Sequence, residues 1–210
     1  MRFVAALTLV LACTLALAGD DRAQALAALE NASMEQRAAA VMWFAQNGTA
    51  ADDKLLLPRL GDDDPLVRDL AERGMWLLWS RSGDDATDAL MQAGSSQLEA
   101  RDTKAAIATY SQVISRKPAF AEGWNKRATA YFLAGDLRRS LADCDQVMKR
   151  NPYHFGALAG YGQIYFQQKQ YDKAIEFWKR ALEVNPNLSG VADRIEIARR
   201  MLERSRKSST

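Results

Sequence analysis

The residue types that most often carry catalysis or metal binding are scarce in this chain. It has one histidine, His154, and two cysteines, Cys13 and Cys144, among 210 residues. A histidine-ligated metal cluster or a Cys-x-x-Cys redox site cannot be built from so few ligands. No serine or cysteine pattern points at His154, which argues against a nucleophilic triad, and Cys144, on the inward face of a helix, is expected to be an inert buried thiol. We therefore expect no catalytic residue, no metal and no cofactor, and a protein that is not an enzyme.

Three consecutive aspartates, Asp62–Asp64, are the other group whose chemistry must be considered. Carboxylates are suitable ligands for Ca²⁺ or Mg²⁺, but the glycine and the distal glutamate of a calcium loop are absent. Asp64 followed by Pro65 is instead the pattern of a helix start, in which the aspartate caps free N–H groups and the proline takes the first helical position. We expect a structural role for these aspartates.

The N-terminus has the composition of a secretory signal peptide. Arg2 is followed by an apolar stretch over residues 3–15 and by a small-x-small cleavage site at Ala16-Leu17-Ala18. We expect cleavage after Ala18 and, since the mature chain would hold Cys144 alone and no disulfide, export to a bacterial periplasm. Two alternatives stay open: a membrane anchor, for which the apolar stretch is short, and a lipoprotein, because residues 10–13 resemble a lipobox that would lipidate Cys13.

Charge is unevenly divided along the chain. Residues 19–93 hold 14 acidic and 7 basic residues, whereas residues 94–210 hold 12 acidic and 20 basic residues. Several bases of the second half are paired near predicted helix C-termini, where the helix macrodipole favours them, and exposed aromatics do not interleave with them. We therefore expect no nucleic-acid partner.

A period of 34 is the strongest pattern in the sequence. Pro118, Pro152 and Pro186 are spaced by this period, and proline ends a helix because it lacks an N–H group and restricts the residue before it. Small residues where two helices must touch lie in the same register: Gly94, Ala128 and Gly162. The pattern predicts first helices over 87–100, 121–134 and 155–168, and second helices over 104–117, 138–151 and 172–185.

These units resemble the tetratricopeptide repeat (TPR) over residues 87–188. The matching residues are Gly94, Ala106, Tyr110 and Pro118 in the first unit, Trp124, Ala128, Tyr131, Gly135, Asp136 and Pro152 in the second, and Gly162, Tyr165, Ala174, Ala181 and Pro186 in the third. The resemblance implies a right-handed α-solenoid whose first helices line a concave groove for a protein or peptide partner. Residues 189–204, apolar on one face and charged on the other, have the character of a capping helix, and residues 205–210 are expected to be a disordered tail.

Residues 22–83 follow a different and fainter period of 31. The segment from Leu60 to Ala71 resembles the short HEAT-like repeats of phycobilisome lyases, and an earlier copy is degenerate, with Ser33 and Gln36 predicted to form a capping box. Pro58 is expected to kink the first helix of the second copy. Four of the five tryptophans are expected in the core: Trp43, Trp76, Trp79 and Trp124.

The TPR resemblance also maps groove-facing positions onto this chain. The candidate partner-binding residues are Asn125, Thr129, Phe132, Gln163, Phe166 and Gln167. Phe132 and Phe166 are expected to be surplus to the core and partly exposed, as anchors of a bound peptide. Some family members grip a terminal carboxylate with cations and amides, but only Lys126 could serve here, so a mixed apolar and amide groove is expected.

The predicted architecture is thus an all-α solenoid. Its parts are a signal peptide (1–18), HEAT-like repeats (19–85), three TPR units (86–188), a capping helix (189–204) and the tail (205–210). The predicted function is that of an exported, non-catalytic scaffold or adaptor with a protein or peptide partner and no membrane span once the signal is removed. The alternatives are a lipoprotein adaptor tethered at Cys13 and a non-catalytic subunit of an envelope enzyme complex.

Overall fold

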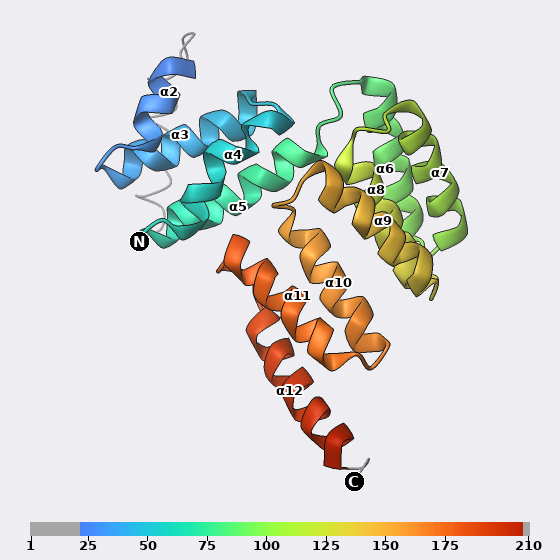
Figure 1. Cartoon of the computed structure of the whole chain (residues 1–210). Coiled ribbons are helices and arrows are strands. Elements are labelled where there is room, and N and C mark those ends of the chain that lie inside the picture. Colours follow the sequence, from blue (N-terminus) through green and yellow to red (C-terminus); the bar gives the residue numbers. More distant parts are fainter. Residues whose placement is uncertain (1–21, 208–210) are drawn as a thin grey trace. The chain divides into compact units, whose positions relative to one another are not determined.

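The computed structural model describes residues 22–207, and its regular elements there are all helices (Figure 1). These residues form two compact units, which divide in the sequence between Arg81 and Ser82. The predicted signal peptide, 1–18, and the end of the predicted tail, 208–210, lie outside the described residues. Within the described part, no helix is both long and apolar enough to cross a membrane.

The first unit is built around the packing of two long helices, α3 on α5. Its elements are α2 (Arg22–Leu29), α3 (Met34–Asn47), the 3₁₀ helix η1 (Ala50–Asp52), α4 (Asp53–Leu56), the 3₁₀ helix η2 (Leu57–Gly61) and α5 (Pro65–Ser80). Gly74 allows close approach, because a Cβ there would lie 2.9 Å from Leu56 Cδ1 and 3.3 Å from Ala45 Cβ. The helical path changes from α4 to η2 at Pro58, as the sequence predicted.

The two predicted helix starts of this unit have different outcomes. Asp64 caps α5 as expected, since its carboxylate accepts a hydrogen bond of 2.8 Å from the N–H of Leu66. Ser33 does precede α3, but its side chain makes no capping hydrogen bond. Its hydroxyl donates instead to Glu35 Oε2 at 2.6 Å. The predicted capping box of Ser33 and Gln36 is therefore wrong, because a nearer carboxylate competes for the hydroxyl.

The prediction of four core tryptophans holds for one of them. Trp79 is buried, and its indole N–H donates to Asp53 Oδ2 at 2.8 Å. Trp43 and Trp76 are only half-buried. Trp124 is also half-buried, with the Arg150 guanidinium 4.6 Å from its ring centroid. A large ring with a polar N–H packs well at the edge of a core, where one end stays in reach of water or charge.

The second unit consists of three antiparallel helix pairs and a final helix. Its helices are α6 (Asp85–Glu99), α7 (Thr103–Arg116), α8 (Ala121–Leu133), α9 (Leu137–Arg150), α10 (Phe155–Gln167), α11 (Tyr171–Val184) and α12 (Val191–Lys207). The extensive contacts are between successive helices: α6 with α7, α7 with α8, α8 with α9, α10 with α11, and α11 with α12. Every predicted repeat helix is present, and its bounds lie close to those predicted.

The period of the sequence reappears in the backbone. Arg101, Gly135 and Lys169, which stand one period apart, have positive φ angles of 62°, 80° and 61°. Each lies in the turn between the two helices of a pair, where the chain must adopt a left-handed conformation to reverse direction. Asp102 and Asp136 follow, and both cap the next helix by accepting a backbone hydrogen bond. The turn is therefore set by backbone geometry, and only one of its three copies uses glycine.

Small residues allow the two helices of a pair to touch, as predicted. A Cβ at Gly94 would lie 2.6 Å from Tyr110 Cζ, and a Cβ at Gly162 would lie 2.7 Å from Trp178 Cε2. Both glycines are buried, and the spacing in the sequence from glycine to aromatic ring is the same in the two pairs. The repeated glycine is thus the surface against which an aromatic ring packs.

The final helix packs on the array by its apolar face. Val191, Ile195 and Ala198 are buried, and Leu202 is partly buried against the same cluster. The helix continues to Lys207, so the predicted disorder of the tail is wrong for residues 205–207. Three bases in this last turn complement the negative end of the helix macrodipole and favour continuation of the helix.

Candidate functional site

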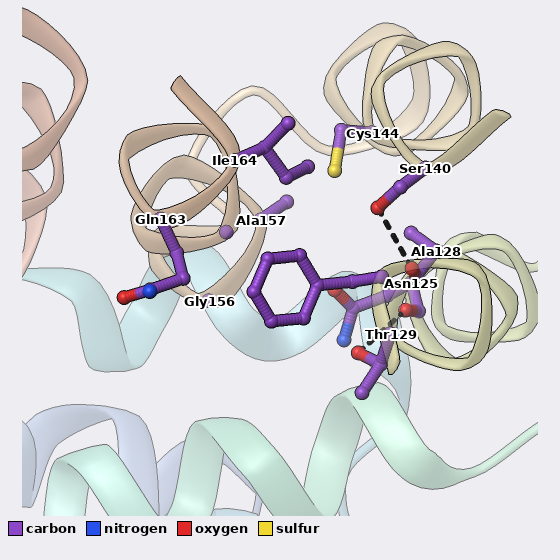
Figure 2. Close-up of a pocket in the computed structure, with 11 residues that line it drawn as sticks. Asn125, Ala128, Thr129, Ser140, Cys144, Gly156, Ala157, Gln163 and Ile164 are labelled. Carbon is purple, nitrogen blue, oxygen red and sulfur yellow. Dashed lines mark hydrogen bonds between the residues drawn. The ribbon is translucent and has the colours of Figure 1, made fainter. Parts of the chain in front are cut away.

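An apolar pocket of about 100 Å³ lies between α8 and α10, over α9 (Figure 2). Its lining residues are Asn125, Ala128, Thr129 and Phe132 of α8, Ser140 and Cys144 of α9, and Gly156, Ala157, Gly160, Gln163 and Ile164 of α10. Many of these side chains are small, so the helices leave space between them. The polar side chains Asn125, Thr129 and Gln163 come from α8 and α10, whereas the buried Cys144 belongs to α9.

The pocket has a simple origin in the repeat. Tyr110 and Trp178 fill the position that Cys144 occupies in the middle helix pair, since the three residues stand one period apart. A thiol is much smaller than either ring, and it faces Ala128 where the other pairs have glycine. A Cβ on Gly160 would still lie 3.9 Å from Cys144 Sγ, which is an ordinary contact distance. The missing aromatic ring therefore leaves a hollow in the array at this repeat.

Cys144 is part of the pocket wall and is not a nucleophile. It is 2% exposed, and burial raises the pKa of its thiol to about 12. A thiol in this state is almost wholly protonated near neutral pH, whereas the thiolate is the reactive form. The expectation that the thiol is buried is confirmed, and its inertness stays a prediction.

The rim of the pocket carries hydrogen-bonding groups. Asn125 Nδ2 donates to Glu122 Oε2 at 3.0 Å, and Thr129 Oγ1 donates to the Asn125 carbonyl at 3.1 Å. On the opposite side, Gln163 Oε1 accepts a hydrogen bond of 3.0 Å from the Arg194 guanidinium of α12. These contacts hold the amide side chains in place beside an apolar hollow.

The structure brings four of the six candidate residues to this pocket: Asn125, Thr129, Phe132 and Gln163. Gln167 is exposed elsewhere on α10, outside the pocket lining. Phe166 is partly buried, and its ring lies 5.4 Å from that of Tyr171 and 5.7 Å from that of Trp178, between ring centroids. Both phenylalanines are partly exposed, as expected. The expectation that they are surplus to the core is wrong, because Phe166 packs on the cluster shared by α10, α11 and α12 and Phe132 packs on the cluster that contains Cys144 and Ile164.

A buried polar pair beneath the rim is the feature that sequence reasoning missed. His154 is fully buried and caps α10, with its Nδ1 accepting from the N–H of Ala157 at 3.1 Å. Its Nε2 therefore holds the proton of the neutral ring and donates to Glu122 Oε2 at 3.0 Å. Lys126, the one candidate for gripping a carboxylate, has its Nζ 3.6 Å from Glu122 Oε1. The one available signal was the place of His154 directly before a predicted helix.

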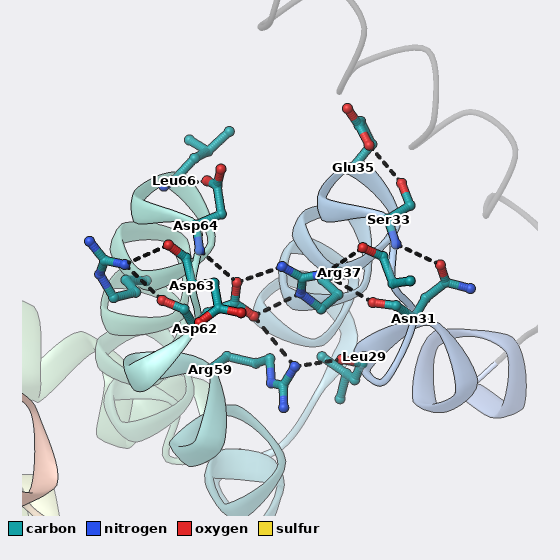
Figure 3. Close-up of polar contacts among 12 residues, drawn as sticks. Leu29, Asn31, Ser33, Glu35, Arg37, Arg59, Asp62, Asp63, Asp64 and Leu66 are labelled. Carbon is teal, nitrogen blue, oxygen red and sulfur yellow. Dashed lines mark hydrogen bonds and ion pairs between the residues drawn. The ribbon is translucent and has the colours of Figure 1, made fainter.

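The side chains of Asp62 and Asp64 have structural partners, whereas Asp63 accepts a hydrogen bond from Arg68 through its backbone carbonyl at 3.1 Å (Figure 3). Asp62 accepts two hydrogen bonds from Arg37, at 2.7 and 2.8 Å, and one from the N–H of Asp64 at 3.0 Å. The Arg37 hydrogen bonds hold the pKa of Asp62 below its usual range. No group of three or more metal-ligating side chains occurs in residues 22–207. Asp62 thus links α3 to the segment before α5 through its hydrogen bonds with Arg37, and Asp64 caps α5.

Comparison with known proteins identifies the second unit. Models of the tetratricopeptide repeat match residues 91–153 and 158–188. A TPR repeat-containing protein of Rhizobium etli is 31% identical over 162 residues, which is 77% of each chain. This chain belongs to the tetratricopeptide repeat family. Both repeat matches lie inside the TPR array, and the HEAT-like interpretation of residues 22–83 stays a prediction.

Another relative and two solved structures each match between about half and three fifths of the chain. The Hsp70-Hsp90 organizing protein 1 of Glycine max is 30% identical over 100 residues, which are 48% of this chain and 17% of that protein. The Sgt2 TPR domain of Aspergillus fumigatus superposes with a TM-score of 0.57, at 22% identity over 60% of this chain and 85% of that one. The first TPR of Spaghetti (RPAP3), bound to an HSP90 peptide, gives 0.54 at 20% identity, over 56% and 93% of the two chains. At these identities the structures show a common fold.

Proposed function

We propose that this protein is a non-catalytic adaptor that binds a peptide segment of a partner protein in the groove of its TPR array. The observation that carries the proposal is the apolar pocket between α8 and α10 with fixed amides at its rim. Its volume of about 100 Å³ is the volume that about three water molecules occupy in the liquid. A pocket of this size suits one branched aliphatic side chain. Asn125 and Gln163 are placed to hydrogen-bond the backbone of the same peptide.

Related TPR domains support a peptide ligand. The RPAP3 domain is bound to the HSP90 peptide SRMEEVD, and the TPR2B domain of yeast Sti1 is in a complex with pHsp70. In this chain the cation expected for a carboxylate, Lys126, already lies beside Glu122. We infer that an apolar side chain, held in the pocket of the middle repeat, contributes more to binding here than a terminal carboxylate does.

A random peptide library displayed on phage provides the test, because the selection works without an identified partner. Selected peptides should share one aliphatic position, and their dissociation constants are measured by calorimetry. Phe132→Ala removes a wall of the pocket, and loss of such an anchor contact weakens binding by about 30-fold or more. Cys144→Leu places a larger side chain from α9 into the pocket and should also abolish binding, although it leaves every rim residue on α8 and α10 unchanged.

Cys144→Ala is the matched control, since it changes the same residue without filling the space. It should bind the selected peptides within a few-fold of the parent. Thermal melts of all variants separate loss of binding from loss of fold. If Cys144→Leu is folded and binds as well as Cys144→Ala, the pocket is not the binding site.

We further propose that the protein is exported, with a mature N-terminus at Gly19. The support is the sequence of residues 1–18, with its apolar stretch and its Ala16-Leu17-Ala18 site. Mass spectrometry of the protein purified from its host tests this. A mass beginning at Cys13 and carrying acyl chains would establish the lipoprotein alternative, and an intact Met1 would refute export with cleavage.

A further inference from the structure

We propose that the C-terminal half of α12, residues 199–207, docks the protein onto a lipid bilayer that carries anionic headgroups. The proposal is separate from peptide binding, since it concerns the last helix and not the pocket between α8 and α10.

The first observation is the concentration of positive charge. Residues 199–207 hold five bases and one acid, a net charge of +4, whereas the whole chain has a net charge of +2. The remainder of the chain therefore has a net charge of −2. A group of four to eight bases on an amphipathic helix is the pattern that binds anionic lipid.

The second observation is the exposure of this segment. The buried residues of α12 end at Ala198, and beyond it only Met201 and Leu202 are partly buried. Figure 1 shows the C-terminal end of α12 extending past α11. Ile197, 42% exposed, stands one turn before Arg200 on the outward side of the same helix. An exposed aliphatic side chain beside bases suits the boundary between headgroups and acyl chains.

The third observation is that three arginines of this segment form no ion pair. Within residues 22–207, Arg200, Arg204 and Arg206 form no ion pair, whereas Arg199 pairs with Glu196 at 2.5 Å. The helix macrodipole accounts for bases in the last turn, but its effect fades within that turn and does not reach Arg200. The guanidinium groups of these three arginines form no ion pair within the described residues and are therefore available to an external surface.

The distribution of these bases favours lipid over a protein or a nucleic acid. At 3.6 residues per turn, Arg199 and Arg206 lie on one side of α12, and Arg200, Arg204 and Lys207 lie on another. A folded acidic partner would have to present carboxylates to both sides. Lipid headgroups diffuse laterally and can gather around each base, so a bilayer matches this spread without a preformed surface.

Co-sedimentation with vesicles tests the proposal on the full chain as purified from cells. The vesicles are phosphatidylcholine alone or phosphatidylcholine mixed with phosphatidylglycerol, and the measured quantity is the binding that depends on the anionic lipid. This binding should be present at low salt and should fall as salt is raised. The variant R200Q/R204Q/R206Q should lose about a hundredfold in affinity, since each base near an anionic surface contributes roughly fivefold.

The matched control is R138Q/K149Q/K179Q, which removes three exposed bases of α9 and α11 and changes the net charge equally. It should bind like the parent. Equal binding to both vesicle types, or equal loss in the two triple variants, overturns the proposal. So does a parent chain that ignores anionic vesicles but binds polyglutamate or duplex DNA through the α12 arginines. Far-UV circular dichroism confirms that each variant is folded.

Discussion

Adding a single methyl group at Gly162 should destabilise the TPR array. The Cβ of an alanine there would lie 2.7 Å from Trp178 Cε2, well inside the distance at which carbon atoms pack. The ring has little room to move, because Trp178 is 1% exposed and its Nε1 donates to the Ala159 carbonyl at 3.2 Å. The helices α10 and α11 must separate or Trp178 must leave its rotamer.

Two opposing effects set the magnitude. Overpacking of a dense core costs about 1–3 kcal/mol, whereas alanine is favoured over glycine inside a helix by about 0.5–1 kcal/mol. The steric effect is larger, so Gly162→Ala should lower the free energy of unfolding by about 1–2 kcal/mol. Gly160 provides the matched control on the same helix, because a Cβ there meets only Cys144 Sγ at 3.9 Å. Gly160→Ala should keep the helix-propensity gain and stabilise the array by about 0.5–1 kcal/mol.

Thermal unfolding followed by circular dichroism measures both variants against the parent chain. A change of 1 kcal/mol shifts the melting temperature of a protein of this size by about 2–4 °C. The two variants should therefore lie on opposite sides of the parent, separated by about 5–10 °C. If Gly162→Ala melts at or above the temperature of Gly160→Ala, the close contact with Trp178 does not control the packing of this helix pair.

Four further outcomes follow from the other sites. The Arg37 hydrogen bonds lower the folded-state pKa of Asp62. The contribution of Asp62 to the free energy of unfolding should therefore be complete above about pH 4, near the unfolded pKa, and should be lost as the pH falls through the folded-state pKa. In an acid titration, Asp62→Asn should lose less stability than the parent chain over that range. Cys144, with a thiol pKa of about 12, should react with iodoacetamide at pH 8 only after denaturant is added, and rapid labelling of the native chain would refute its burial. His154→Ala should cost about 2–3 kcal/mol in urea unfolding, because it removes a helix cap and one of the two hydrogen-bond donors of the buried Glu122 carboxylate, which keeps its bond from Asn125, whereas His154→Asn should lose less. The mature protein should begin at Gly19, and N-terminal mass spectrometry of the purified protein checks this.

The TPR helices could be predicted because their determinants are local and recur. A proline ends the helix before it, as at Pro118, Pro152 and Pro186. The constant period places the same local signals in every repeat. The turn residues Arg101, Gly135 and Lys169 were less evident, since the left-handed conformation is shared while the side chains differ. The predictions were wrong where one group has a choice of partners, as when the Ser33 hydroxyl bonds Glu35 and does not cap its helix. They were also wrong where a large ring lies at the edge of the core, as at Trp124.

Composition and period are enough to specify an all-helical repeat array with few residues suited to catalysis, because both are properties of the linear chain. Which of the groove-facing residues share a pocket depends instead on how the helices pack. Phe132 and Phe166 occupy equivalent repeat positions and both pack on a core cluster, yet Phe132 also borders a hollow, whereas Phe166 lies against the rings of Tyr171 and Trp178. The difference depends on side-chain volumes in the facing helices, and on Cys144 above all. Likewise, Glu122 and His154 are 32 residues apart in the chain but 3.0 Å apart in space. Packing between repeats brings such residues together, and no local pattern encodes it.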